Sequence, residues 1–105
     1  MFDGVAFRAG HKHLLVLARE SATQQPRIGL IIAKRHVRTA VARNRVKRLV
    51  RESFRRRRQQ LPALDLVVLG RSGVHRLDNQ TLLGILDDVW TRLEKQAHTL
   101  DRPQD

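Results

Sequence analysis

The segment TAVARNRVKRLVRESFRRRRQQ, residues 39–60, contains the pattern that decides how this chain folds. Its apolar residues recur three and four positions apart, which is the spacing of an amphipathic helix with one buried face. These residues are Ala42, Val46, Leu49, Val50 and Phe54. We therefore expect a helix from about Thr39 to Gln60 whose apolar face packs on the rest of the domain.

The opposite face of this predicted helix is basic. At about 100° per residue, the side chains of four residues lie within about 40° of the pole opposite Val46. They are Asn44, Arg48, Arg51 and Arg55, and the residues flanking them are Arg45, Lys47, Arg56 and Arg58. Arg43 lies instead beside the apolar edge, from where it could reach along the sheet or into a neighbouring groove.

All of the charge imbalance lies in this region. The 105 residues carry a net charge of +11, and the stretch from Lys34 to Arg58 holds 12 basic residues against one acid, Glu52. A solvated helix normally mixes charge signs at i and i+4, so this pattern favours a polyanion partner over a merely solvated face. Arginine outnumbers lysine ten to two here, which suits phosphate contacts of structured RNA. A membrane-surface helix is disfavoured because the core needs its apolar residues.

Three further stretches predict strands. Residues 13–19 and 27–34 are short apolar runs separated by a turn at 21–26, and we expect them to form an antiparallel pair. Residues 4–9 can add an edge strand, and Leu64–Gly70 is a third strong strand. If that strand pairs in parallel with an earlier one, the long helix is its crossover connection.

A second amphipathic helix is predicted to begin near Asp78 or Asn79, either of which can cap it. Its apolar positions are Leu82, Ile85, Leu86, Val89, Trp90, Leu93 and Ala97. The prediction is an α+β fold, a small two-layer sandwich of a mixed sheet of three or four strands with a long basic helix and a C-terminal helix. One RNA-binding domain spans residues 1–98, followed by a disordered tail at 99–105.

The residue inventory excludes several classes of function. The chain has no cysteine, so disulfide scaffolds, zinc fingers and thiol chemistry are ruled out. No apolar run approaches the roughly 18 residues of a membrane span, and no signal peptide is present, so we expect a cytoplasmic protein. The five histidines lack metal-ligand spacing, and adjacent Asp87 and Asp88 point about 100° apart on a helix. We expect no catalytic residue and no metal site.

The stretch ARNRVKRLVRESF, residues 42–54, closely resembles the RNR-motif helix of the bacterial ribonuclease P protein component. Its setting is similar to the family's as well, with RIGL at 27–30, AKR at 33–35, LPALDLVV at 61–68 and LDN at 77–79 in the family's order and spacing. The resemblance runs from about Gly4 to Leu93.

This resemblance implies a protein subunit that assists a catalytic RNA in removing the 5′ leader from precursor tRNA. The expected partners are the ribonuclease P RNA and precursor tRNA, with no membrane and no small-molecule substrate. The RNA would supply the active site and its Mg²⁺ ions, and the protein itself would bind no cofactor. It would raise substrate affinity and lower the Mg²⁺ demand of the RNA.

The resemblance also implies two binding surfaces, an RNR helix that faces the RNA subunit and a cleft between helix and sheet for the single-stranded leader. The residues expected to bind RNA are Lys34, Arg35, Arg38, Arg43, Asn44, Arg45, Lys47, Arg48, Arg51 and Arg55. The residues expected at the leader cleft are Phe2, His13, Leu15, Leu17, Lys34, Arg35 and Arg43.

The chain departs from the family pattern at its start. The family order is αβββαβα, and Met1 and Phe2 stand where the first helix ends, so we expect that helix to be missing here, by truncation or a late-assigned start. The sheet face that carries His13, Leu15 and Leu17, or the alternate face, would then be partly uncovered and the domain less stable. The alternatives are a generic structured-RNA binder, such as a ribosomal protein, and a self-sufficient nuclease, which the residue inventory disfavours.

Overall fold

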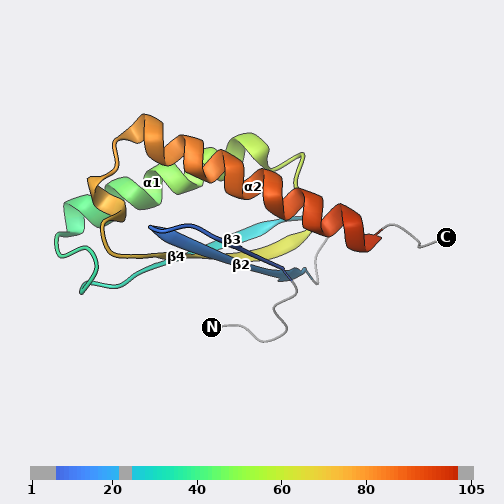
Figure 1. The fold of residues 1–105 in the computed structure, drawn as a ribbon, viewed down its shortest axis with the longest axis horizontal. Helices are drawn as coiled ribbons and strands as arrows, with labels where there is room; N and C mark the ends of the chain where they lie inside the picture. The colour runs from blue at the N-terminus through green and yellow to red at the C-terminus, as the bar shows by residue number, and fades with distance from the viewer. Residues whose placement is uncertain (1–6, 22–24, 102–105) are drawn as a thin grey trace.

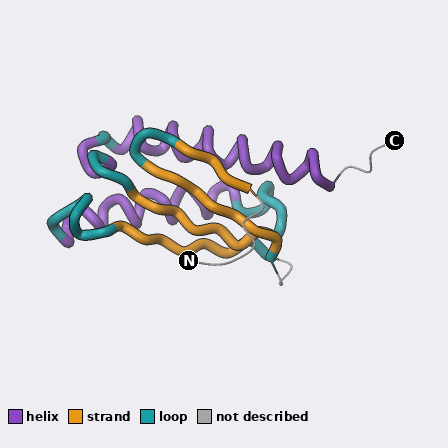
Figure 2. The backbone as a smooth tube through the Cα atoms, turned by 60° about the horizontal axis from the view of Figure 1, so that its bottom comes forward, coloured by secondary structure: helices purple, strands orange, loops and turns teal. Residues whose placement is uncertain are grey.

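A computed structural model describes residues 7–21 and 25–101. Two helices lie together on one face of a four-stranded sheet and leave its other face open, as Figures 1 and 2 show. In chain order the elements are β1 Phe7–Gly10, β2 Leu14–Glu20, β3 Arg27–Ile32, α1 Ala40–Arg57, β4 Leu64–Gly70, a short 3₁₀ turn Val74–Arg76 and α2 Asn79–Asp101. The predicted two-layer α+β sandwich is confirmed.

The strand order is β1-β2-β4-β3, so the predicted direct pairing of residues 13–19 with 27–34 is wrong. Strand β4 lies between them, antiparallel to β2 and parallel to β3. The central place suits β4 because its LDLVVLG sequence is apolar on both faces, whereas β3 alternates exposed and half-buried residues and therefore tolerates an edge. The long helix α1 is the crossover between the parallel strands, as expected.

The helix boundaries follow from their caps. Thr39 begins α1, because its Oγ1 accepts a hydrogen bond of 3.2 Å from the backbone N–H of Ala42. Of the two candidate caps for α2, Asp78 is the one used, since its Oδ1 accepts from the N–H of Thr81 at 2.8 Å. Helix α2 continues to Asp101, beyond the predicted start of the tail at residue 99, and residues 102–105 lie outside the described part.

The core lies between the helix layer and the sheet. The buried residues of α1 include the predicted Val46, Leu49, Val50 and Phe54. Trp90 of α2 is fully buried, donates from Nε1 to Ser53 Oγ at 2.8 Å, and meets the ring of Phe54 edge-on at 6.0 Å. The two helices are therefore joined by a buried hydrogen bond as well as by apolar contact, and this fixes how α1 presents its outer face.

Candidate RNA-binding surfaces

The outer face of α1 carries what we name the outward stripe, namely Asn44, Arg48, Arg51 and Arg55. All four residues are exposed, as the helical angles predict. Within residues 7–21 and 25–101, none of their side chains has a hydrogen-bond or ion-pair partner. Three guanidinium groups lie along one helix face, and none of them forms an ion pair within the described residues, although Glu52 lies close by on the same helix. Each can donate paired hydrogen bonds to a phosphate.

Arg45 does not belong to this exposed surface, although it was predicted to flank it. Its guanidinium turns toward the segment before α2 and donates to Asn79 Oδ1 at 3.0 Å and to the backbone oxygens of His75 and Leu77. The side chain therefore holds that segment against α1. Helical angle places the Cβ atom, but the long arginine side chain can fold back onto a neighbouring element.

This contact predicts a stability effect for Arg45 that its neighbour Arg48 lacks. Replacing Arg45 by alanine leaves carbonyl acceptors unpaired and should lower the free energy of unfolding by about 1 to 3 kcal/mol. Arg48→Ala, on the exposed side of the same helix, should change it by less than about 0.5 kcal/mol. The two variants are compared by urea unfolding, monitored by circular dichroism. Equal unfolding midpoints would contradict the role of Arg45 in holding the segment before α2 against α1.

Two more arginines of α1 act inside the protein. Arg43 Nη1 donates to the backbone oxygens of Val37 at 2.9 Å and Arg38 at 3.0 Å, so it fixes the loop between β3 and α1 rather than pointing into a groove. Arg57 pairs with Asp87 and, at 3.1 Å, with Glu94 of α2. Asp88 pairs with Arg92, so both adjacent aspartates are matched by arginines.

The second candidate surface is the face of the sheet opposite the helices, which we name the open sheet face. Leu14, Val16 and Ala18 of β2 point into the core, so the predicted Leu15 and Leu17 face outward. The strand register places Leu69 and Ile31 in line with Leu15, and Val67 and Gly29 in line with Leu17. Ile31 is 49% exposed. This face is therefore an apolar strip that the described helices do not cover.

An ion cluster closes one end of the open sheet face. Asp65 of β4 lies between Arg19 and Arg27, accepting from Arg27 Nε at 2.9 Å and Nη2 at 3.0 Å, with Arg19 Nε 3.5 Å away. The bidentate hydrogen bonds from Arg27, followed by the other nearby donors and charges, hold the pKa of Asp65 below its usual value.

This lowered pKa predicts how stability depends on pH. The unfolded chain binds the Asp65 proton at higher pH than the folded chain, so the contribution of the cluster is complete above the ordinary aspartate pKa and is lost as pH falls through the lowered one. Asp65→Asn should therefore destabilise the domain at pH 7, and the difference from wild type should shrink in acid. Urea midpoints at pH 7 and pH 3 test this, and a difference that grows in acid would refute it.

The predicted leader-cleft residues do not form one cluster. Leu15 and Leu17 lie on the open sheet face, Lys34 and Arg35 are exposed just beyond β3, and Arg43 faces its own loop. His13 lies at the start of β2, and Phe2 lies outside the described residues. What remains is the open sheet face with basic residues at both of its ends.

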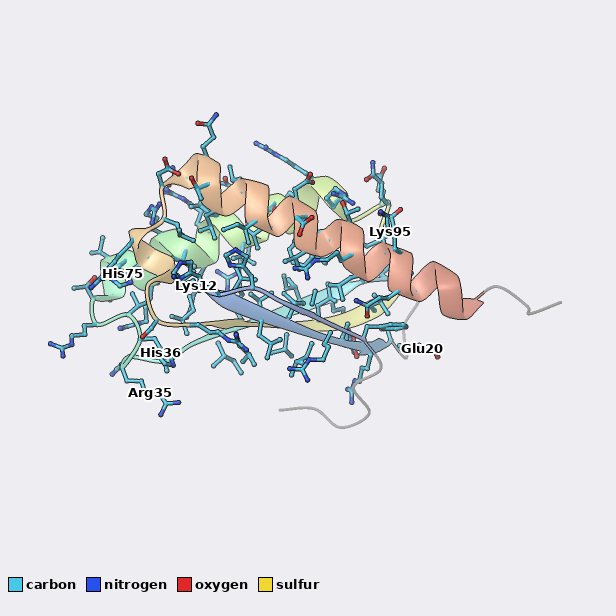
Figure 3. All side chains as sticks on the ribbon, viewed as in Figure 1. Lys12, Glu20, Arg35, His36, His75 and Lys95 are labelled. Carbon is cyan, nitrogen blue, oxygen red and sulfur yellow. The ribbon has the colours of Figure 1, made fainter. Side chains whose placement is uncertain are left out.

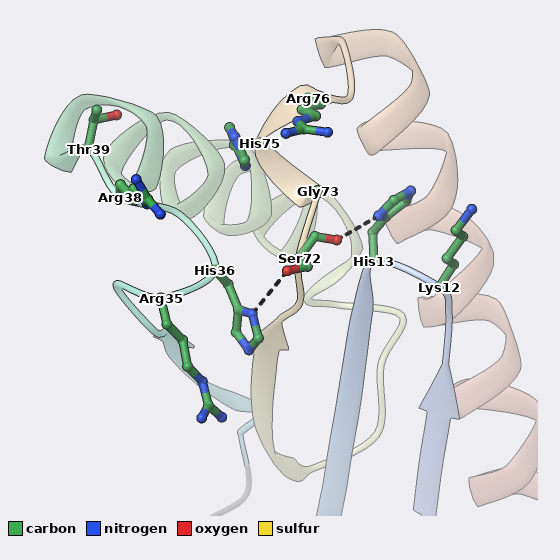
Figure 4. A pocket seen from close by; sticks show the side chains of 10 residues that line it. All are labelled: Lys12, His13, Arg35, His36, Arg38, Thr39, Ser72, Gly73, His75 and Arg76. Atoms are coloured by element: carbon green, nitrogen blue, oxygen red, sulfur yellow. Dashed lines mark hydrogen bonds between the residues drawn. The ribbon is translucent and has the colours of Figure 1, made fainter.

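A pocket of about 700 Å³ opens at the end of the sandwich where β3 and β4 finish (Figure 4). We name it the end pocket, and ten residues line it: Lys12, His13, Arg35, His36, Arg38, Thr39, Ser72, Gly73, His75 and Arg76. Only three of them, His13, Arg35 and Arg38, have a role predicted from the sequence. The others were missed because they come from three loops far apart in the chain, although the density of basic residues and histidines in each loop is visible in the sequence.

Over the described residues, no three histidine, aspartate or glutamate side chains come close enough to hold a metal ion together. None of the described helices is long and apolar enough to cross a membrane.

A free arginine stripe on a helix that is anchored to a mixed sheet defines a small α+β domain with a surface suited to a polyanion. The chain matches the family model described as Ribonuclease P over residues 5–94. It is 53% identical over 97 residues to the ribonuclease P protein component of Chromohalobacter salexigens, covering 92% of this chain and 76% of the relative. The same component of Edwardsiella ictaluri is 50% identical over 90 residues, covering 86% of this chain and 76% of the relative.

Solved structures agree with these sequence matches. The RNase P protein from Thermotoga maritima superposes with a TM-score of 0.74 at 28% identity, covering 82% of this chain and 84% of that one. The Staphylococcus aureus RNase P protein, at 22% identity, shares the fold with a TM-score of 0.75, covering 81% of this chain and 78% of that one. The chain belongs to the ribonuclease P protein component family, and its role is that of a protein subunit of ribonuclease P.

Proposed function

We propose that this subunit binds the ribonuclease P RNA through the outward stripe and the 5′ leader of precursor tRNA along the open sheet face. The RNA supplies the active site and its Mg²⁺ ions, and the protein itself carries no catalytic residue. The observation that carries the proposal is the stripe itself, because Arg48, Arg51 and Arg55 are exposed and have no partner among the described residues.

The placement of the two surfaces supports this division of roles. The outward stripe faces away from the sheet, and the open sheet face lies on the other side of the sandwich, beneath the helices in Figure 1. One domain can thus contact two RNA segments at the same time without competition between them. Leader contacts exist only in the precursor, so they favour substrate over mature product.

The open sheet face suits a single strand of low sequence preference. Its apolar strip offers flat contact for bases, and the arginines beside Asp65 and the exposed Lys34 and Arg35 lie near its two ends. Apolar contact with the faces of bases, combined with backbone contacts, tolerates any sequence, so leader recognition should depend on length more than on base identity. Neutralising RNA phosphates also reduces the repulsion that Mg²⁺ otherwise screens, which lowers the Mg²⁺ requirement.

The test is cleavage of precursor tRNA at limiting Mg²⁺ by a bacterial ribonuclease P RNA, with the protein added or omitted, and by the protein alone. We expect cleavage with RNA and protein together, little with the RNA alone and none with the protein alone. Adding the protein should increase the cleavage rate more for substrates with a full leader than for substrates with a leader of one nucleotide. Cleavage by the protein alone, or an equal gain for both substrates, would overturn the proposal.

A further inference from the structure

The end pocket is lined by cations that no acid neutralises. Lys12, Arg35, Arg38 and Arg76 are exposed, and none of their side chains has a hydrogen-bond or ion-pair partner within the part of the chain that the structure describes. No aspartate or glutamate is among the ten lining residues. Elsewhere Asp65, Asp87, Asp88 and Glu94 pair with arginines, so the end pocket, like the outward stripe, lacks the counter-charge that those four acids supply.

Ser72 contacts two histidines that line the end pocket, His13 and His36. Its backbone oxygen can only accept, so His13 Nδ1 donates to it, at 3.1 Å. His36 Nδ1 lies 3.3 Å from Ser72 Oγ, and Figure 4 shows the two imidazoles on either side of this residue. Two loops that are distant in sequence are thereby joined to the loop after β4.

Gly73 allows this arrangement. Its φ of 85° lies in the left-handed region, and a Cβ atom at this position would lie 3.0 Å from Cε1 of His13. A side chain here would therefore both strain the backbone and displace the imidazole. The hydrogen bonds of Ser72 are thus built on a turn that only glycine accommodates without strain.

Guanidinium, ammonium and imidazole groups that line one concavity suit a phosphate group. The volume of about 700 Å³ also leaves room for a sugar on either side, which favours a nucleic-acid backbone over a lone ion. The pocket lies at the end of the sandwich, with His75 on the helix side and Arg35 on the sheet side in Figure 3. A strand passing from the outward stripe to the open sheet face would cross it.

We propose that the end pocket binds a backbone phosphate of RNA as a third contact, held by Arg76, Lys12 and the imidazole of His36. This inference rests on the proposed function for the identity of the ligand, since the same groups would also accept free phosphate. It adds to the RNA surface residues from three loops, Lys12 before β2, His36 before α1 and Arg76 after β4.

The first arm of the test needs no RNA. The ¹⁵N-labelled full chain is titrated with inorganic phosphate at constant ionic strength, and the amide signals of His36 and Gly73 are followed. We expect saturable shifts whose apparent Kd rises roughly fivefold in Arg76→Gln and by less in Lys12→Gln, as loss of a charge-assisted contact predicts. The matched control is Lys95→Gln, an exposed lysine on α2 toward the other end of the molecule, and it should leave the titration unchanged.

The second arm measures binding to the ribonuclease P RNA across a range of salt. Arg76→Gln should weaken binding and reduce the slope of log Kd against log salt by about 0.7 to 0.9, the loss of one phosphate contact. Shifts that do not saturate, or that respond equally to Lys95→Gln, overturn the pocket. A changed phosphate titration with unchanged RNA binding overturns RNA as its ligand. Failure of the wild type to bind the RNA refutes the proposed function, while the first arm still reports on the pocket.

Discussion

The double substitution Arg48→Ala/Arg51→Ala should weaken binding of the chain to the ribonuclease P RNA by roughly 30- to 100-fold near physiological salt. Both guanidinium groups are exposed on the outward stripe and have no partner within the described residues. Their loss therefore removes charge-assisted contacts to phosphate without leaving any protein group unpaired. Equilibrium binding across a salt series should also show a slope reduced by about 1.4 to 1.8, as for two phosphate contacts.

Stability and charge controls separate this effect from others. The unfolding midpoint of the double variant should match wild type, because neither side chain packs in the core. Glu52→Gln removes the one acid of the basic segment and should leave RNA binding equal or slightly tighter, which shows that the sign of the charge matters and not mere substitution on the helix. A folded double variant with wild-type affinity would contradict the proposal that the outward stripe binds the ribonuclease P RNA.

The faces of α1 were predictable because Cα geometry alone determines them. Val46, Leu49 and Val50 are buried and Arg48 and Arg51 are exposed, as a 100° step requires. The fates of Arg43, Arg45 and Arg57 were not predictable in the same way. Each guanidinium lies several bonds from its backbone, and the acceptors of Arg45 and Arg57 come from residues about 30 positions away.

Strand order was the part of the fold that local pattern could not give. The runs that became β2 and β3 are adjacent in sequence and of similar apolarity, so direct pairing was the simplest expectation. Instead β4 pairs with both, from Leu14↔Gly70 on one side to Ile32↔Gly70 on the other. The continuous apolar sequence of β4 indicates a central strand. This indication determines the strand order only when β4 is compared with β3, whose alternating pattern suits an edge strand.

The candidate site likewise has one part that sequence periodicity predicts and another part that it does not. The outward stripe and the outward direction of Leu15 and Leu17 follow from the periods of a helix and a strand, although the sequence left the face of β2 open. The end pocket needs three loops to meet, and the hydrogen bonds of Ser72 that join them link residues 36 and 59 positions apart. No period of the sequence encodes such a meeting, so it became visible only in three dimensions.

Trp90→Ala should have the largest effect on folding, lowering the free energy of unfolding by about 3 to 5 kcal/mol. The indole is fully buried between the layers, packs edge-on against Phe54, and its N–H is the donor to Ser53 Oγ. Truncation leaves a cavity and an unpaired hydroxyl together. Trp90 is the only tryptophan of the chain, so unfolding of the variants must be followed by circular dichroism and not by fluorescence.

Since Trp90→Ala can fail to fold, Trp90→Phe keeps the effect measurable. It retains most of the buried ring but removes the N–H donor, and should cost about 1 to 3 kcal/mol, as should Ser53→Ala, which leaves the indole N–H unpaired. If the hydrogen bond is the shared cause, the double variant should cost less than the sum of the two single variants. Additive losses would show that the 2.8 Å contact does not couple the helices. Ser53 and Trp90 lie on the inner faces of α1 and α2, so these substitutions leave the outward stripe in place. Added ribonuclease P RNA should therefore bind Trp90→Phe, stabilise its folded state and raise its unfolding midpoint.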